Sequence, residues 1–145
     1  MSARFYDQEV DARLGEKRRL SAFLDELIKS HRPEVKKISL IYIFCTDEAL
    51  LSINQQFLDH DTFTDIVTFD LSEKETELTG ELYISTERIA DNAAKFKTTY
   101  QRELHRVIFH GALHLCGFKD KRKKDQELMR AQEEHNLQAW FHTSN

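Results

Sequence analysis

The sequence predicts an α+β fold, in which about five helices pack against a small mixed sheet of about four strands. Segments with helical spacing of apolar residues alternate with short strand-like segments along the chain. One strand-like segment is almost entirely apolar, and two others alternate and are joined by a short polar stretch, as in an antiparallel pair. No repeat, linker or low-complexity tract interrupts the 145 residues, so a single domain over residues 1–145 is expected.

The N-terminal half is predicted to contain a helix, a strand and a second helix. Residues 13–31 carry apolar residues at helical spacing, and Pro33 follows as a helix stop. Residues 38–45 (ISLIYIFC) are rich in β-branched and aromatic residues, which favours a strand buried on both faces. Asp47 is the candidate N-cap of a helix that continues to Leu58.

The C-terminal half is predicted to contain the antiparallel pair and three helices. The two strands are residues 66–71 (IVTFDL) and 80–85 (GELYIS), and the charged residues 72–79 between them predict a turn region. A polar stretch before the pair, residues 59–64, predicts a loop. Helical spacing predicts the last three elements as helices, over residues 86–96, 99–116 and 121–141.

Composition limits the environment and the class of protein. No apolar run approaches the ~20 residues that cross a bilayer, and the N-terminus lacks the apolar block of a secretory signal, so a cytoplasmic protein with no membrane partner is expected. Cys45 and Cys116 lie in apolar surroundings and are expected to be reduced and buried. The formal net charge of -4 disfavours a protein whose whole surface binds nucleic acid, but it permits a local basic patch.

The clearest chemistry lies in residues 102–120 (RELHRVIFHGALHLCGFKD). His110 and His114 are four positions apart on a predicted helix, which places their Cβ atoms about 5–6 Å apart on one face. Two imidazoles placed in this way can bind one metal ion. The helix is otherwise apolar here, and burying two imidazoles is costly unless they have partners. Two histidines satisfied by ordinary hydrogen bonds are the alternative interpretation, because the spacing by itself is weak evidence.

Two glycines bear on the same site. Gly111 is expected to leave the surface beside His110 open, and Gly117 lets the chain turn so that Asp120 can return to the same ion. In metallopeptidases of the HExxH type, the residue directly after the first histidine is the catalytic glutamate, and here that residue is Gly111. The replacement of this glutamate by glycine argues against a peptidase.

Other side chains of this helix have weaker claims to a role in the site. His105 and Cys116 lie on other sides of the helix, and both are expected to be packing residues. Glu103 and Arg106 fall near the His110 face, where they either support the site, contact a substrate or form a solvated face.

Three segments of the chain resemble the YbeY family. HGALHLCGFKD resembles its signature H-G-x-L-H-L-x-G-[YF]-x-H. Residues 53–70 (INQQFLDHDTFTDIVTFD) are similar to the family segment L-N-x-x-Y-R-x-x-x-x-P-T-D-V-L-S-F, and GELYIS is similar to the G-D-I-x-I-S that follows it. The matches come in family order, and their combination is far more specific than any one of them.

The resemblance implies a metal-dependent endoribonuclease on a zincin-like scaffold, with the metal site on a helix and the following loop. It implies cleavage of single-stranded RNA, in maturation of the 3′ end of 16S ribosomal RNA and in ribosome quality control. The implied partners are therefore single-stranded RNA and the ribosome or its small subunit. One zinc ion, or another divalent metal, is expected, and the residues that would bind it and act in catalysis through it are His110, His114 and Asp120.

The chain departs from the family pattern at three positions. Asp120 replaces the third histidine, and a carboxylate also binds zinc, although its added negative charge favours harder ions. Leu58 replaces an arginine that the resemblance links to phosphate binding, so another cation must take that role or it is lost. Phe63 replaces a proline.

Four residues are expected to contact the substrate. Lys119 and Lys121 belong to a basic stretch that flanks Asp120, although such a stretch is often only a solvated helix start. Thr64 lies in the matched loop, and Arg106 lies near the His110 face.

Two other functions stay open from the sequence. One is a metal hydrolase or peptidase on a similar scaffold, and the other is a ribosome-assembly factor whose ion is structural. In the endoribonuclease interpretation, the ion acts as a Lewis acid on a phosphodiester, and the sequence does not distinguish attack by water from attack by the ribose 2′-OH.

Overall fold

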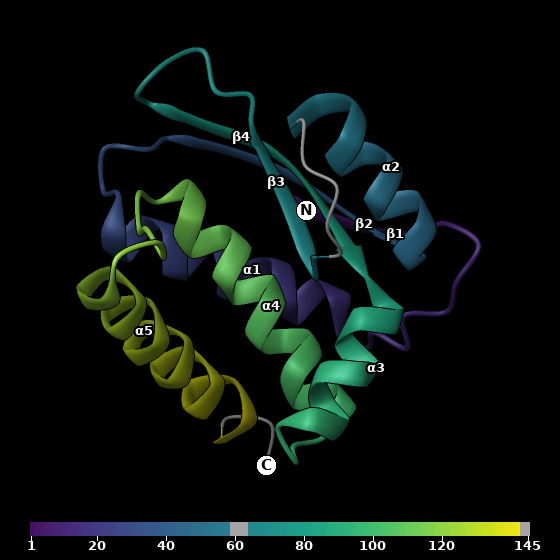
Figure 1. The fold of residues 1–145 in the computed structure, drawn as a ribbon. Coiled ribbons are helices and arrows are strands. Elements are labelled where there is room, and N and C mark those ends of the chain that lie inside the picture. The colour runs from purple at the N-terminus through teal and green to yellow at the C-terminus, as the bar shows by residue number, and fades with distance from the viewer. Residues whose placement is uncertain (59–63, 143–145) are drawn as a thin grey trace.

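A mixed sheet in the order β1-β2-β4-β3 lies at the centre of the computed structural model, which describes residues 1–58 and 64–142 (Figure 1). β2 pairs in parallel with both β1 and β4, whereas β3 and β4 are antiparallel, as predicted for this pair. The strands are β1 (Ala3–Asp7), β2 (Lys37–Cys45), β3 (Ile66–Asp70) and β4 (Glu77–Ser85).

Helices cover both faces of the sheet unequally. α2 lies on one face, and α1, α4 and α5 lie on the opposite side (Figure 1). In the described residues, no helix is both long and apolar enough to span a membrane. The predicted α+β class is confirmed, with the helices α1 (Lys17–His31), α2 (Asp47–Leu58), α3 (Thr86–Lys95), α4 (Tyr100–Leu115) and α5 (Lys123–His142).

The main core lies between the sheet and the helices α1, α4 and α5. Alternate residues of β2 point into it, and each such buried side chain contributes about 1.5–3 kcal/mol. The hydroxyl of the fully buried Tyr42 donates to the carbonyl of Ile108 at 2.9 Å, which ties the central strand to α4. On the α2 side, Ile41 and Ile43 are only half-buried. The predicted burial of this strand on both faces is therefore wrong, because α2 packs over β3 and β4 instead.

β1 completes the expected number of strands, although the sequence patterns do not locate it. Only Ala3 and Phe5 of its residues are buried, and Arg4 and Asp7 are exposed. β1 is an edge strand, and edge strands commonly carry charged residues that prevent further pairing.

Two predicted boundaries shift for identifiable reasons. α1 begins at Lys17 rather than at residue 13, because Arg13 and Glu16 have φ values of 55° and 51°, which a right-handed helix excludes. β4 begins at Glu77, inside the predicted turn region, because it pairs with β2 from Lys37 onward.

The N-terminus of α2 is capped by Thr46 and not by Asp47 as predicted. The Thr46 hydroxyl accepts a hydrogen bond from the Ala49 N–H at 3.1 Å. The Asp47 carboxylate instead accepts from Ser85 and Arg88. Apart from Thr64, the predicted loop over residues 59–64, with Phe63, lies outside the described residues.

Candidate metal centre

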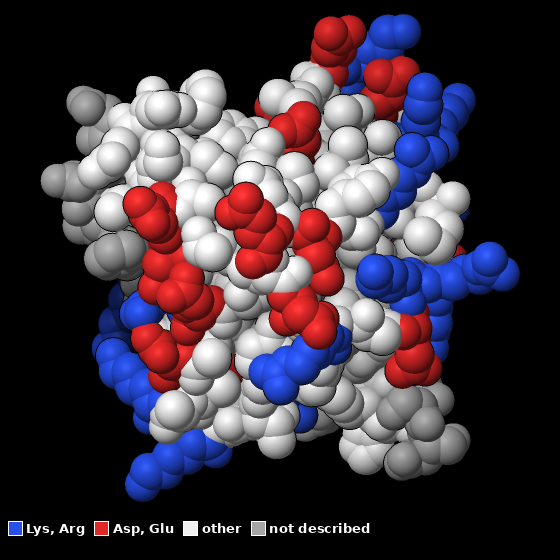
Figure 2. Space-filling view, turned by 90° about the vertical axis from the view of Figure 1, so that its right-hand side faces the viewer, with Lys and Arg blue, Asp and Glu red and all other residues white. Residues whose placement is uncertain are grey.

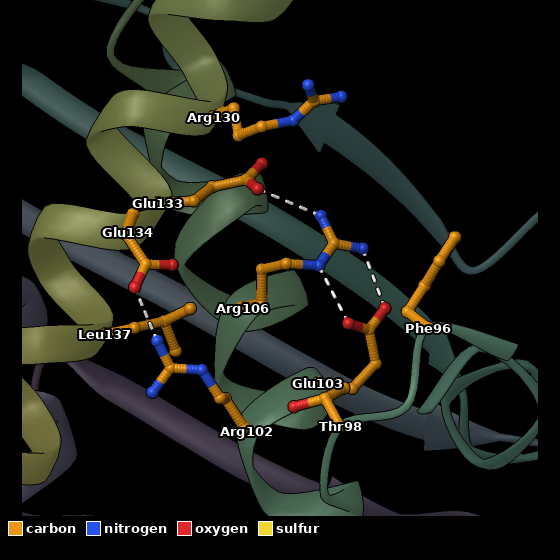
Figure 3. Close-up of a pocket in the computed structure, with 9 residues that line it drawn as sticks. All are labelled: Phe96, Thr98, Arg102, Glu103, Arg106, Arg130, Glu133, Glu134 and Leu137. Carbon is orange, nitrogen blue, oxygen red and sulfur yellow. Dashed lines mark hydrogen bonds and ion pairs between the residues drawn. The ribbon is translucent and has the colours of Figure 1, made fainter. Parts of the chain in front are cut away.

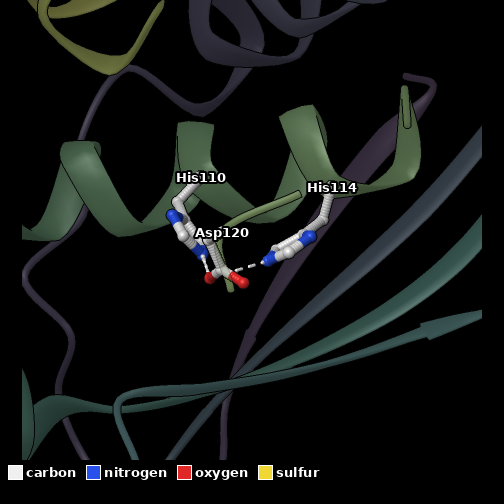
Figure 4. A group of neighbouring side chains, drawn as sticks. All are labelled: His110, His114 and Asp120. Carbon is white, nitrogen blue, oxygen red and sulfur yellow. Dashed lines mark hydrogen bonds and ion pairs between the residues drawn. The ribbon is translucent and has the colours of Figure 1, made fainter. Parts of the chain in front are cut away.

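His110, His114 and Asp120 converge at one point beside α4. Asp120 Oδ2 lies 3.2 Å from His110 Nε2 and 3.1 Å from His114 Nε2 (Figure 4). One donor atom from each residue lies within 4.8 Å of the other two. Two ligands bound at about 2.0–2.1 Å in a tetrahedral zinc site are about 3.4 Å apart, so the three side chains fit such an ion.

The end of α4 brings Asp120 to the two histidines. The Gly117 N–H donates to the His114 carbonyl and the Phe118 N–H donates to the Leu113 carbonyl, which is the paired hydrogen bonding of a Schellman motif. Gly117 has a φ of 105°, a conformation that glycine adopts without the steric cost of a Cβ. The chain then reverses and places Asp120 over the last turns of the helix, as the sequence predicts (Figure 4).

Gly111 faces the sheet rather than the open side of the site. A Cβ at this position would lie 2.4 Å from Leu82 Cδ2 and 2.8 Å from Ile66 Cδ1. The prediction that Gly111 leaves the surface beside His110 open is therefore wrong, because the glycine instead lets α4 approach β3 and β4 closely. A glutamate here would enter the packed core, so the HExxH glutamate would require a shift of α4 or of the Leu82 and Ile66 side chains.

A hollow of about 500 Å³ lies between α4 and β3 and includes the three converging residues. Thr64 and Asp65, just before β3, line it, as do Leu58 from α2 and Lys121 from beyond Asp120. Burial raises the pKa of the Asp65 carboxyl, although Arg106 and His110 oppose the shift.

The residues predicted to contact substrate lie around the site in different ways. Thr64 and Lys121 line the hollow, whereas Lys119 is exposed beside His114 and Asp120. Arg106 lies deeper, and its guanidinium donates hydrogen bonds to the carboxylates of Glu103 and Glu133. Contact of these residues with RNA stays a prediction.

Glu133 of α5 is the residue of this site that sequence reasoning missed. Its Oε2 lies 2.6 Å from His110 Nδ1. Its Oε1 accepts a hydrogen bond from Arg106 Nη1 at 3.0 Å (Figure 3). Glu133 is only 5% exposed and lies in a stripe with Met129 and Leu137, each four residues away on α5. A carboxylate inside an apolar helix stripe is the signal that could have identified it.

The same contacts shift the pKa values of the buried pair. Burial alone would lower the pKa of His110, but the hydrogen bond to Glu133 and the nearby carboxylates raise it above its ordinary value. Burial alone would raise the pKa of Glu133, but the hydrogen bond with His110 and the charge of Arg106 lower it. The pair is therefore a carboxylate that accepts from an imidazole N–H.

Other residues singled out in this region are packing residues. His105 is 4% exposed and its ring stacks on Trp140, with 5.2 Å between the centroids. Cys45 is buried and Cys116 is half-buried, and both are free cysteines. The expected burial is confirmed for Cys45, whereas Cys116 is only partly buried.

Charged side chains on the α2 and α3 side of the molecule do not form a basic surface. In Figure 2, acidic side chains gather across the middle of this face, and most lysines and arginines lie toward its edges. This face agrees with the expectation that the whole surface does not bind nucleic acid.

Comparisons with known proteins identify the family of the chain. The family model described as "Endoribonuclease YbeY" matches residues 5–140. An endoribonuclease YbeY from Cytophaga hutchinsonii is 42% identical over 133 residues, which cover 92% of this chain and 92% of the relative. The corresponding protein from Christiangramia forsetii is 48% identical over 120 residues, which cover 83% of this chain and 81% of the relative.

A solved structure supports the same fold. The solution structure of TM1509 from Thermotoga maritima aligns with a TM-score of 0.58 at 24% identity, and the alignment covers 98% of this chain and 93% of that chain. This likeness supports the fold alone, whereas the family model and the relatives span most of the sequence. The chain that carries this site therefore belongs to the YbeY endoribonuclease family.

Proposed function

We propose that this chain is a metal-dependent endoribonuclease that cleaves single-stranded RNA, and that it acts in maturation of the 3′ end of 16S ribosomal RNA and in ribosome quality control. The observation that carries the proposal is the convergence of His110, His114 and Asp120 beside an open hollow in a chain of this family. The proposed partners are single-stranded RNA and the ribosome or its small subunit, and the proposed location is the cytoplasm.

The three converging residues are proposed to hold one zinc ion. Two imidazoles and one carboxylate are common zinc ligands, and a catalytic zinc site keeps a further position open. The side chains of His110, His114 and Asp120 are 16%, 31% and 38% exposed, so the site faces solvent on one side. A bound zinc ion supplies a Lewis acid that polarises a phosphoryl oxygen and makes water more acidic. Two imidazoles and one carboxylate also bind Fe(II), so another divalent metal such as iron is the alternative to zinc.

Residues around the hollow are proposed to hold the RNA. Lys121 lines the same hollow as Leu58, and we assign to this lysine the phosphate contact that a leucine cannot make. Lys119 lies exposed beside His114 and adds a second positive charge at the rim. Thr64 offers a hydroxyl that can donate to a phosphate or ribose oxygen.

A cleavage assay combined with metal analysis tests the proposal. Protein purified without an affinity tag should contain about one ion per chain and should cut labelled single-stranded RNA. His114→Ala and Asp120→Ala should lose both the ion and the cleavage, whereas His135→Ala, an exposed histidine on α5, should keep both. An ion that persists in Asp120→Ala would show that the ligand set is wrong. Products ending in a 2′,3′-cyclic phosphate would identify the 2′-OH as the nucleophile.

The non-catalytic assembly factor makes a contrasting prediction. Leu58 in the hollow favours it, because an apolar side chain there removes a phosphate contact. If the ion were only structural, His114→Ala would lose metal and stability but keep ribosome association and biological rescue. The peptidase alternative is disfavoured by the packing of Gly111 against Leu82, and digestion of casein by repurified protein would be needed to restore it.

A further inference from the structure

A chain of charged groups, in which Glu103 and Glu133 are buried and Arg106 is half-buried, reaches the metal centre from the side opposite to Asp120. It runs from Glu103 through Arg106 to Glu133 (Figure 3), and Glu133 contacts His110. We propose that Glu133, held in place by Arg106, is a positioning residue that orients His110 for metal binding before the ion arrives. This inference rests on the metal site of the proposed function.

The first step is the choice of nitrogen on His110. A carboxylate only accepts hydrogen bonds, so the 2.6 Å contact between Glu133 Oε2 and His110 Nδ1 requires a proton on Nδ1. In the neutral ring this leaves the lone pair on Nε2, which is the nitrogen that faces Asp120 at 3.2 Å. Glu133 therefore sets both the tautomer and the ring orientation that a metal ligand requires.

The second step is the fixing of Glu133 itself. Each of its oxygens has one partner, since Oε2 contacts His110 and Oε1 accepts from Arg106 Nη1 at 3.0 Å. Burial on α5 also prevents the carboxylate from turning toward water. The carboxylate is thus held at both ends, and its position depends on the packing of α5 against α4.

The third step is the anchoring of Arg106. Its Nε and Nη2 donate to the two oxygens of Glu103 at 2.9 Å and 2.8 Å, and Glu103 is only 2% exposed. Asp65 lies 3.6 Å from the same guanidinium. Because these carboxylates already occupy Arg106, its proposed role is to hold Glu133 rather than to contact RNA.

The charges favour a cation at the metal centre. Glu103, Glu133 and Asp65 all lie within ion-pair distance of Arg106, so three carboxylates surround one guanidinium and negative charge is in excess. The Glu133 carboxylate is the one of these groups that contacts His110. It makes the imidazole a better electron donor toward a bound metal, as carboxylates behind histidine ligands do.

Zinc affinity tests the inference without RNA. Competition with a chelator should show binding roughly 10–100-fold weaker in Glu133→Ala, and a smaller loss in Glu133→Gln, which keeps an acceptor but removes the charge. Arg106→Lys keeps the charge but cannot bridge both glutamates, so it should also weaken binding. Glu134→Gln is the matched control, because Glu134 is exposed and pairs with Arg102, and its affinity should change by less than about two-fold.

A spectroscopic measurement separates positioning from general stability. Long-range ¹H–¹⁵N correlation spectra of the metal-free protein should show His110 with its proton on Nδ1, and Glu133→Ala should populate the other tautomer. Glu133→Gln retains the shape of the side chain. If the alanine variant does not fold, the tautomer of His110 in Glu133→Gln therefore tests the positioning role.

The outcomes distinguish this inference from the proposed function. Unchanged zinc affinity and an unchanged tautomer in both Glu133 variants would overturn the positioning role while the nuclease still cleaved RNA. A wild-type protein that binds no zinc or other divalent ion would overturn both proposals. Loss of zinc affinity in Glu133→Ala, with RNA uncut by the wild type, would support the positioning role and refute the nuclease.

Discussion

Replacement of Gly111 by valine should destabilise the fold, because α4 approaches the sheet most closely at this glycine. An added Cβ would lie 2.4 Å from Leu82 Cδ2 and 2.8 Å from Ile66 Cδ1, both shorter than real carbon contacts. The two atoms are side-chain ends, but Leu82 is fully buried, so its side chain has little space to move into. Either α4 must shift or the side chains must leave their packing.

The cost follows from two opposing terms. Overpacking a core costs about 1–3 kcal/mol, and the three carbons of valine place this change near 3 kcal/mol. Valine is a better helix former than glycine by about 0.5 kcal/mol. The net destabilisation is about 2.5 kcal/mol, which lowers the Tm of a chain of this size by roughly 5–10 °C. Gly111→Ala adds one methyl group and regains about 1 kcal/mol of helix propensity, so its net cost is about 1 kcal/mol.

Denaturant and thermal unfolding in the presence of a chelator measure this effect free of any contribution from bound metal. Gly15→Val is the control, because a Cβ at Gly15 meets nothing within 4 Å, and its stability should stay within about 0.5 kcal/mol of the wild type. Equal stability of Gly111→Val and the wild type would refute the close helix–sheet contact. The free energy of unfolding should decrease from the wild type to Gly111→Ala and further to Gly111→Val.

Three further perturbations have defined outcomes. Charge reversal of Lys121 and Lys123 should weaken RNA binding and reduce the salt dependence of log affinity by about 0.7 per lost phosphate contact, and an unchanged slope in fluorescence anisotropy would contradict this. Gly117→Ala should lower the free energy of unfolding by about 1–2 kcal/mol, because the φ of 105° strains any residue with a Cβ. Denaturant titration measures this loss, and an unchanged free energy of unfolding would be inconsistent with the turn. Burial lowers the pKa of His105. As the pH falls below about 6.5, the unfolded chain therefore takes up a proton before the folded chain does, and the free energy of unfolding decreases as the pH is lowered. His105→Phe should reduce this acid sensitivity in metal-free protein, and an equal pH dependence of unfolding in both proteins would disprove it.

The helices and the antiparallel strands could be predicted because their signals are local. Burial of one face imposes a period on the residues that point inward, and this period is visible within a single segment such as α4 or β4. The edge strand β1 has too few buried residues to show a period. The early start of β4 depends on pairing with β2, which lies far away in the sequence.

The role of Gly111 could not be predicted, because it depends on a distance between elements. Helix spacing places position 111 beside His110, but only the packed sheet shows that this position faces Leu82. The same reason explains the wrong cap of α2, since the Asp47 side chain has distant partners in Ser85 and Arg88.

The sequence by itself determined the fold class, the spacing of His110 and His114 on one helix face, and the turn at Gly117 that returns Asp120 to them. These features depend on hydrogen bonds and side-chain directions within a few residues of the chain. Only the tertiary structure decided that Glu133, 23 residues after His110, lies behind its ring, and that Arg106 is held by carboxylates. Such contacts depend on how α5 packs against α4, and the packing of two helices is set by all the side chains between them rather than by a local pattern.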